Sequence, residues 1–191
     1  MKFATADLFD AYADQLQVCE PIFLDFGGNT NFCGAIRTLK IFESFAMTKT
    51  TLATDGDGCI LVIDAGGSLR CAMLGDKLSQ LAIDHGWKGI LINGCIRDSA
   101  AISNLSIGVK ALTTNPTRPC FEGESQLDIP VRFAGVTFRP GDFLYADADG
   151  VVGVSTTCLR VLSAQNGNTL AIQHMPIETL ERSTHGSTKK Q

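Results

Sequence analysis

The stretch from Gly75 to Asp98, GDKLSQLAIDHGWKGILINGCIRD, predicts one helix that leads directly into one strand. Leu78, Leu81 and Ala82 have the i, i+3, i+4 spacing of a helix that buries one face. We expect this helix to begin directly after Gly75 and to end at Gly86. The rest of the chain is interpreted relative to this unit.

Two short apolar runs flank the helix and predict buried strands. Gly89–Ile92 is four residues long and bracketed by glycines, and Cys59–Asp64 is equally apolar and is closed by Ala65–Gly67. The order strand, glycine-rich turn, helix, strand over about 59–93 is a βαβ unit, whose crossover is right-handed and whose strands are parallel. The sequence therefore predicts an α/β fold with a central β layer.

Both strands of this unit are followed by segments with polar chemistry. In parallel sheets ligands collect outside the carboxyl ends of the strands, where Gly66–Leu78 and Asn93–Asp98 are expected to lie. The backbone N–H groups of Asp76, Lys77 and Leu78 would point outwards from the helix start, where they and the helix dipole favour a carboxylate or a phosphate. Residues about twenty positions apart could therefore face one pocket.

An arginine and two carboxylates give that pocket its predicted chemistry. Arg97 offers a planar fork that suits a carboxylate or an oxyanion. Asp98 and Asp76 offer hard oxygen ligands for Mg²⁺ or Mn²⁺. Together they describe a site for a small oxo acid whose reaction develops negative charge. The alternative, left open by spacing alone, is a helix-capping aspartate beside a solvated Arg-Asp pair.

These residues also carry a family resemblance. The spacing of Asp76, then twenty residues, then Arg97-Asp98 resembles the signature of the 4-hydroxy-4-methyl-2-oxoglutarate aldolase family, and so does the segment Asn93–Asp98. This family shares its fold with the regulator of ribonuclease activity A (RraA). The similarity extends over about 150 residues, to about Val154. Further segments that resemble the family are Val18–Pro21, Phe26–Gly28, Phe133–Val136 and Gly141–Val151.

The resemblance implies a divalent-metal-dependent, class II aldolase that cleaves 4-hydroxy-4-methyl-2-oxoglutarate into two pyruvates and also decarboxylates oxaloacetate. By the same resemblance, Asp98 holds the metal, Mg²⁺ or Mn²⁺, and Arg97 contacts the substrate's keto and carboxylate oxygens and stabilises the enolate. The turn Gly75, Asp76, Lys77, Leu78 binds substrate through backbone amides. Asp76 also organises water on the metal, and such a water or hydroxide is our candidate proton acceptor.

For the architecture, the resemblance implies a β/β/α swivelling-domain fold that assembles into a trimeric ring, or a hexamer, with sites between subunits. We expect one catalytic domain over 1–154 and a C-terminal extension over 155–191, partly disordered at its end. Family aldolases often carry a glutamate on a C-terminal helix that reaches the neighbouring metal site. No convincing helix is predicted here, and Glu178 and Glu181 are unsupported substitutes.

The resemblance leaves a second function open. A non-enzymatic RraA-like protein would bind ribonuclease E or its helicase partners and inhibit RNA degradation. RraA proteins of this kind can lack the acidic and Arg-Asp set, which favours the enzyme here. The missing aldolase-type extension favours the regulator instead.

Composition bounds the class of protein. The 191 residues suit one domain, and 45% hydrophobic with 19% charged residues describes a compact protein. The formal charge of -4 gives no general attraction to nucleic acid, and we expect no direct nucleic-acid or membrane partner. The seven scattered cysteines lack a CxxC spacing. Reduced, buried thiols in a cytoplasmic protein are therefore favoured over disulfides or zinc.

Other segments predict further elements in chain order. We expect helices over Thr5–Gln15, capped by Thr5 or Asp7, over Met47–Asp55 and over Ser99–Asn104. Strands are expected over Phe32–Phe42, Ile107–Leu112, Val131–Phe138, Phe143–Tyr145 and Val151–Val154, with antiparallel pairing late in the chain.

Several further positions have more than one interpretation. Asp64–Ser68 could be a nucleotide or S-adenosylmethionine loop, but without the rest of a fingerprint its glycines are better explained by a tight turn. For Arg70 a surface ion pair is favoured over an anion contact, and for His85 a helix-end role over catalysis. Asp147 and Asp149 suit a cation or, equally, local backbone caps. Arg118 could face the pocket, but the sequence does not place it.

Overall fold

The computed structural model describes residues 3–119 and 123–156. The helices are α1 (Thr5–Tyr12), α2 (Ala46–Leu52), α3 (Asp76–Asp84) and α4 (Ser99–Ile102), and a 3-10 turn, η1, covers Ala13–Gln15. The strands are β1 (Leu16–Val18), β2 (Leu24–Asp25), β3 (Phe32–Ile41), β4 (Ile60–Asp64), β5 (Ala72–Leu74), β6 (Gly89–Ile96), β7 (Gly108–Thr114), β8 (Ser125–Leu127), β9 (Val131–Phe133), β10 (Val136–Phe138), β11 (Phe143–Ala146) and β12 (Val151–Val154). Cys120, Cys158, Glu178, Glu181 and nearly all of the expected extension lie outside the described residues.

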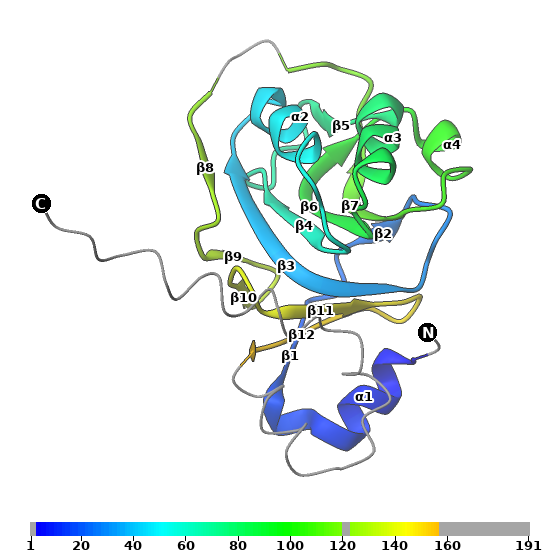
Figure 1. Cartoon of the computed structure of the whole chain (residues 1–191), viewed down its shortest axis with the longest axis vertical. Coiled ribbons are helices and arrows are strands. Elements are labelled where there is room, and N and C mark those ends of the chain that lie inside the picture. Colours follow the sequence, from blue (N-terminus) through cyan, green and yellow to red (C-terminus); the bar gives the residue numbers. More distant parts are fainter. Residues whose placement is uncertain (1–2, 120–122, 157–191) are drawn as a thin grey trace, which may run out of the picture.

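One mixed sheet organises these elements. Its main path runs β1-β12-β11-β3-β4-β6-β7-β2, with β5 beside β6 and β8 beside β3. The long strand β3 joins two halves, since Phe32–Ala35 pairs antiparallel with β11 and Ile36–Lys40 pairs parallel with β4 (Figure 1). The structure thus confirms an α/β fold with a parallel centre and antiparallel strands late in the chain.

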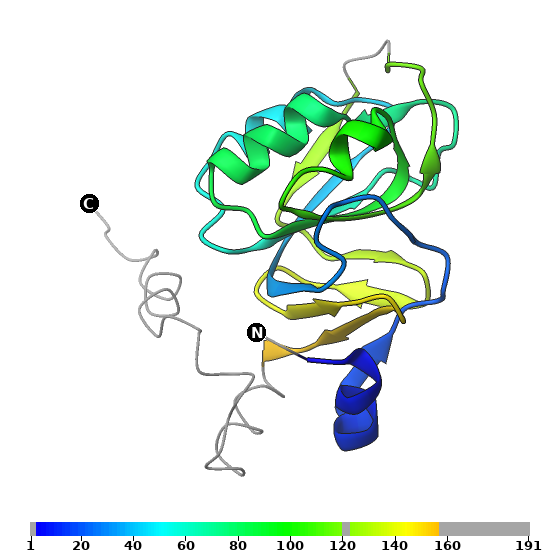
Figure 2. The same cartoon turned by 90° about the vertical axis from the view of Figure 1, so that its right-hand side faces the viewer.

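The predicted βαβ unit is present. Residues 60–64 of β4 lie parallel to residues 89–93 of β6, and α3 lies between them in the sequence. Figures 1 and 2 show α2, α3 and α4 together at one end of the molecule, over the parallel strands, whereas α1 lies at the other end beyond β1 and β12. The carboxyl ends of the parallel strands are therefore next to the helices that follow them.

The central strands are buried on both faces of the sheet, which explains why their sequences are continuous apolar runs. Leu61 and Ile63 of β4 pack toward the helices, in a core that also contains Leu52 and Trp87. Ile60 and Val62, which alternate with them along β4, pack on the opposite face, against the β9–β10 hairpin and β11. This second core includes Ile36, Ile60, Val62, Leu91, Val131, Phe133, Val136, Phe138 and Leu144.

Three details differ from the sequence-based expectations. The strand predicted over Gly89–Ile92 continues to Ile96, and β5, which no pattern predicted, pairs with that extension. The segment Val131–Phe138 is not one strand but the hairpin β9–β10, because Ala134 and Gly135 both adopt positive φ and turn the chain back.

The expected cap of α1 was also wrong. Ala4 occupies the N-cap position, and no side-chain hydrogen bond is made from it. The side chain that caps the helix is instead Asp147, on the β11–β12 turn. The Asp147 carboxylate accepts the Thr5 backbone N–H at 2.6 Å and the Thr5 hydroxyl at 2.7 Å. It also accepts the N–H groups of Asp149 and Gly150 at 3.0 and 3.3 Å. Of the two predicted roles, cation ligand or backbone cap, the structure therefore shows the cap.

Replacement of Asp147 by asparagine is expected to lower the free energy of unfolding by roughly 1.5–3 kcal/mol at neutral pH, since the bonds have an ionised acceptor. Burial acts to raise the pKa of Asp147, but the hydrogen bonds from Thr5, Asp149 and Gly150 outweigh it and the net pKa is lowered. The stabilisation is therefore present above the ordinary aspartate pKa and is lost as pH falls through the lowered value.

Urea unfolding of wild type and Asp147→Asn between pH 7 and pH 3 checks this. Asp149→Asn is the matched control, because that side chain is exposed on the same turn. A difference between wild type and Asp147→Asn that grows on acidification would contradict the assignment.

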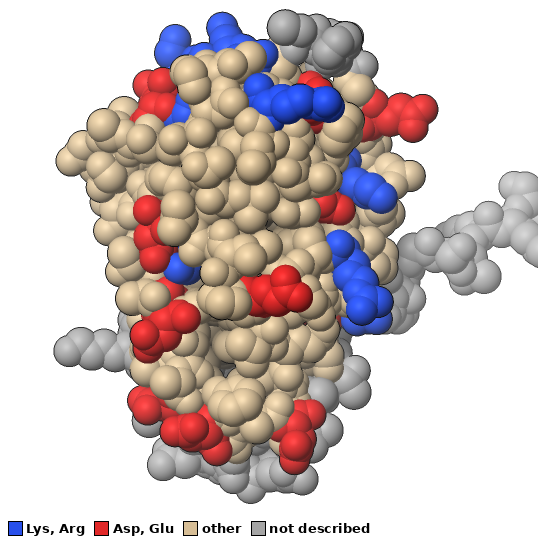
Figure 3. Space-filling view, turned by 180° about the vertical axis from the view of Figure 1, so that it is seen from behind, with Lys and Arg blue, Asp and Glu red and all other residues tan. Residues whose placement is uncertain are grey.

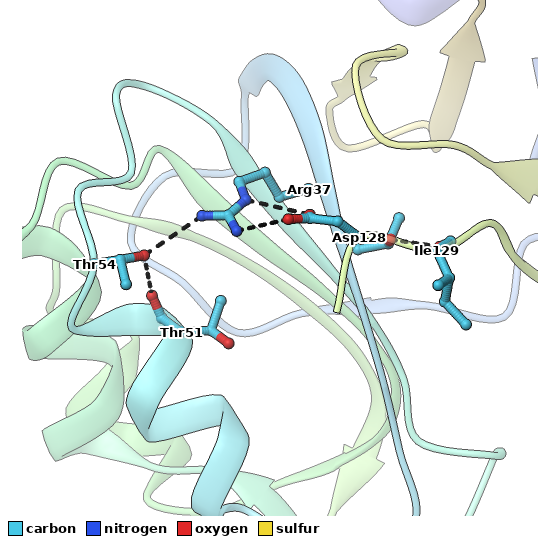
Figure 4. Close-up of polar contacts among 6 residues, drawn as sticks. Arg37, Thr51, Thr54, Asp128 and Ile129 are labelled. Atoms are coloured by element: carbon cyan, nitrogen blue, oxygen red, sulfur yellow. Dashed lines mark hydrogen bonds and ion pairs between the residues drawn. The ribbon is translucent and has the colours of Figure 1, made fainter. Parts of the chain in front are cut away.

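A second polar cluster links the helical layer to the sheet edge. The Arg37 guanidinium donates to both Asp128 oxygens, at 3.3 and 2.7 Å, and to the Thr54 hydroxyl at 3.5 Å, while that hydroxyl donates to the Thr51 carbonyl at 2.7 Å (Figure 4). The guanidinium also lies 5.8 Å from the Trp87 ring centre. The cluster joins the end of α2 to the segment after β8, and this arrangement is structural.

Four cysteines in the described part of the chain are free thiols, namely Cys19, Cys33, Cys59 and Cys95. Burial is the largest cause that raises the pKa of the Cys19 thiol, to about 12, and it also raises the pKa of Cys33, Cys59 and Cys95. These thiols are thus poor nucleophiles. Among the described residues, no helix combines the length and apolarity that crossing a membrane requires.

Candidate functional site

The two predicted polar segments meet in one cavity of about 200 Å³. Gly75, Asp76, Lys77 and Leu78 line it together with Arg97 and Asp98. They meet because β5 and β6 are adjacent parallel strands with Leu74 opposite Ile96, so the residues that follow both strands leave the sheet at the same edge. The Arg97 N–H donates to the Leu74 carbonyl at 2.9 Å and fixes this junction.

Asp98 is the centre of this site. Its backbone is left-handed, with φ 57°, which is uncommon for a residue with a side chain. Its Oδ2 lies 3.3 Å from Nε of Arg97 and 3.4 Å from the backbone N of Asp76. The side chains of Arg97 and Asp98 are 31% and 36% exposed, so both groups can meet a ligand.

Gly75 makes the close approach of these groups feasible. A Cβ added to this residue would lie 2.7 Å from Asp98 Oδ2 and 3.4 Å from the Arg97 side chain. Any other residue here would displace the carboxylate, so the glycine is explained by space, not by backbone conformation.

The helix start is already in contact with carboxylates. Asp98 accepts the Asp76 N–H, and the Asp76 side chain accepts the Lys77 N–H at 2.7 Å. Of the three amides expected to face an anion, only that of Leu78 is not engaged by a carboxylate from the described residues. A substrate that binds through the other two must therefore displace Asp98 or Asp76.

The donor set fits a magnesium-type cation. No cluster of three or more histidine, cysteine or acidic side chains suited to a metal occurs in the described ranges. Mg²⁺ does not require one, since it is usually held by one or two carboxylates and keeps several waters or substrate oxygens. Asp98, with Asp76 beside it, supplies this kind of partial ligand set.

The cavity also contains residues that the sequence analysis did not assign to the site. Phe45 is the N-cap residue of α2, Lys49 lies within that helix, and Ala72, Met73 and Leu74 form β5. Arg118, which the sequence left unplaced, lines the cavity with Pro119, and its guanidinium carbon lies 5.7 Å from the Phe45 ring centre. No local spacing signals these residues, because tertiary packing brings them to the site.

The glycine-rich loop after β4 does not contribute to the cavity. The Asp64 carboxylate accepts the Gly66 N–H and the Asn93 side-chain amide, both at 3.0 Å, and a Cβ on Gly66 would meet the Phe42 ring at 2.9 Å. Gly66 and Gly67 both have positive φ, as the tight-turn interpretation requires. This packing argues against a nucleotide loop.

Arg70 and His85 have the structural roles that were favoured. Nε of Arg70 lies 2.5 Å from Glu43 Oε1, and hydrogen bonds from Arg70 and Ser68 lower the pKa of Glu43. Nδ1 of His85 lies 2.9 Å from the Leu81 carbonyl at the end of α3. Neither residue lines the cavity.

A larger cavity, of about 790 Å³, lies between α1, β1 and β12. Its walls are mainly apolar, from residues such as Phe9, Val18 and Phe23, and the buried Lys110 ammonium at its edge is paired with Asp25 at 2.8 Å. It contains none of the predicted site residues. We therefore assign the chemistry to the smaller cavity.

Comparison with known proteins finds relatives that match most of this chain. The chain is 49% identical over 152 residues to a Laribacter hongkongensis protein and 50% identical over 152 residues to one from Pseudomonas syringae pv. tomato. Both matches cover 80% of this chain, and they cover 96% and 94% of those proteins. Each relative bears the name "Putative 4-hydroxy-4-methyl-2-oxoglutarate aldolase".

Two solved structures share the fold. The first, from Geobacillus kaustophilus, is titled S-adenosylmethionine: 2-dimethylmenaquinone methyltransferase, with TM-score 0.80, 44% identity and coverage of 86% of this chain and 100% of that one. The second is the RNA-processing inhibitor RraA from Thermus thermophilis, with TM-score 0.77, 38% identity and coverage of 81% and 93%. A family model described as RraA-like, Aldolase/RraA, matches residues 5–153. The chain therefore belongs to the RraA-like family.

Proposed function

We propose that this protein is a divalent-metal-dependent aldolase that cleaves 4-hydroxy-4-methyl-2-oxoglutarate into two pyruvates. The observation that supports this most is the meeting of Gly75–Leu78 with Arg97 and Asp98 in one small cavity. The names of relatives at about 50% identity point to the same reaction. The metal, the class II mechanism and an oxaloacetate decarboxylase activity are parts of this proposal, as is action as a trimer or hexamer.

The proposed cleavage breaks the bond between C3 and C4 of the substrate. The electron pair remains on the pyruvyl half as an enolate, the C4 hydroxyl loses its proton and becomes a carbonyl, and the enolate is then protonated at C3. Loss of CO₂ from oxaloacetate leaves the same enolate. One arrangement that stabilises this charge therefore serves both reactions.

Arg97 is the residue whose geometry suits that charge. Its guanidinium is planar, always charged and held beside Asp98 at 3.3 Å, so its remaining N–H groups can donate to the keto and carboxylate oxygens of the pyruvyl half. The Leu78 amide at the start of α3 adds a further donor. A divalent cation held by Asp98, when bound, would supply Lewis-acid stabilisation of the same oxygens.

The test is pyruvate release from 4-hydroxy-4-methyl-2-oxoglutarate and from oxaloacetate by the full chain, with Mg²⁺ or Mn²⁺ and then with excess EDTA. We expect two pyruvates per molecule of the first substrate and a loss of activity with EDTA. No release above the metal-only blank from a folded protein would exclude the aldolase.

A second candidate function rests on the similarity to the RNA-processing inhibitor RraA. In that case the protein would bind ribonuclease E and slow RNA cleavage without chemistry of its own. Inhibition of ribonuclease E by a protein that releases no pyruvate would establish this function in place of the first.

A further inference from the structure

The cavity carries more positive charge than the proposed reaction centre uses. Four basic side chains line it, namely Lys49, Lys77, Arg97 and Arg118, against two acidic ones, Asp76 and Asp98. A divalent cation would add to this excess. A substrate that balances the charge must carry more than the single carboxylate of a pyruvyl group.

Two of these cations are on elements separate from the Arg97–Asp98 pair. Phe45, the N-cap residue of α2, and Lys49 are four residues apart, and the Lys49 N–H donates to the Phe45 carbonyl at 3.0 Å, so both lie on one face of this short helix. The Arg118 guanidinium lies over the Phe45 ring, which orients it beside the same turn. Lys49 and Arg118 thus belong to one wall of the cavity.

The backbone holds that wall in place. The Thr117 carbonyl accepts the Ala72 N–H of β5 at 2.9 Å, directly before Arg118. The Asn115 N–H donates to the Ile96 carbonyl at 2.9 Å, directly before Arg97. The segment that carries Arg118 is therefore attached to both strands that deliver the reaction centre.

We propose that Arg118 and Lys49 form a second anion subsite, which binds the carboxylate distal to the pyruvyl group and makes the enzyme selective for dicarboxylate oxo acids. This inference rests on the proposed aldolase function. Arg97 and the start of α3 bind the pyruvyl end, and Arg118 and Lys49 bind the other. A cavity of about 200 Å³ suits a substrate of this small size.

The test compares two substrates that differ only at the distal group. In 4-hydroxy-2-oxopentanoate a hydrogen replaces the distal carboxylate of 4-hydroxy-4-methyl-2-oxoglutarate, and cleavage of the same bond gives pyruvate and acetaldehyde. Arg118→Gln, Lys49→Gln and the double variant are assayed for pyruvate release with both substrates. Lys88→Gln and Arg139→Gln are the matched controls, because both side chains are exposed and lie outside the cavity.

We expect kcat/KM for the dicarboxylate to fall roughly 10–100-fold in each single variant, as the loss of a charged hydrogen bond predicts. With the monocarboxylate the same variants should stay within about twofold of wild type, because the pyruvyl end is unchanged. An equal fall with both substrates, or no fall with either, would overturn the subsite. A wild-type protein that cleaves neither substrate would remove the proposed function and this inference together.

Discussion

Replacement of Arg97 by alanine is expected to lower kcat for pyruvate release about 10²–10³-fold, since removal of one donor to a developing oxyanion typically has this effect. Arg97 lies 3.3 Å from Asp98 and lines the cavity beside the start of α3. In the proposed reaction enolate charge develops in the transition state, so we expect the loss to fall on kcat more than on KM.

Steady-state kinetics on 4-hydroxy-4-methyl-2-oxoglutarate measures this split. Arg97→Lys should recover only part of the rate, because a lysine keeps the charge but not the planar fork. Arg139→Ala, an exposed arginine outside the cavity, is the matched control. Wild-type kcat in Arg97→Ala would remove Arg97 from the reaction centre.

Replacement of Asp98 by alanine is expected to raise the Mg²⁺ concentration for half-maximal activity by at least about tenfold, since the variant lacks the carboxylate that we propose as the metal ligand. The change would also leave Arg97 and the Asp76 amide without their shared acceptor. Titration of activity with Mg²⁺ and Mn²⁺ distinguishes the two effects, because only weaker metal binding is overcome by added metal.

Asp149→Ala provides a control for the removal of a surface carboxylate, as Asp149 is exposed and distant in sequence from the site. If Asp98→Ala and Asp149→Ala both show the wild-type metal requirement, Asp98 is not a metal ligand.

The central βαβ unit could be predicted because its signals are local. The apolar runs of β4 and β6 reflect burial on both faces, and the spacing of Leu78, Leu81 and Ala82 reflects one buried helix face. Once both strands were assigned, the rule for the carboxyl ends of parallel strands was enough to bring Arg97 and Asp98 to the start of α3. The cavity confirms this meeting of segments.

The features that were missed depend on contacts between distant residues. Strand β5 has three residues and no periodic pattern, and it exists through its pairing with the end of β6. The cap of α1 comes from Asp147, 142 residues away from Thr5 in the sequence. No helix-start rule based on neighbouring residues could identify it.

The same reason explains the incomplete site prediction. Lys49 and Arg118 reach the cavity only after α2 packs beside α3 and the segment after β7 hydrogen-bonds to β5 and β6. On the face shown in Figure 3, acidic side chains gather at the end where α1 lies, and several basic ones lie at the opposite end, where α2 and α3 lie. Sequence spacing alone does not contain this segregation.

The measurement that tests the central claim most directly is a crystal structure with Mn²⁺ and oxalate, a stable mimic of the pyruvate enolate. The anomalous signal of Mn²⁺ should lie at coordinating distance from the Asp98 carboxylate, with the oxalate between the metal, the Arg97 guanidinium and the start of α3. Mn²⁺ and oxalate bound in the larger cavity beside Lys110, with Arg97 and Asp98 free of both, would contradict the account.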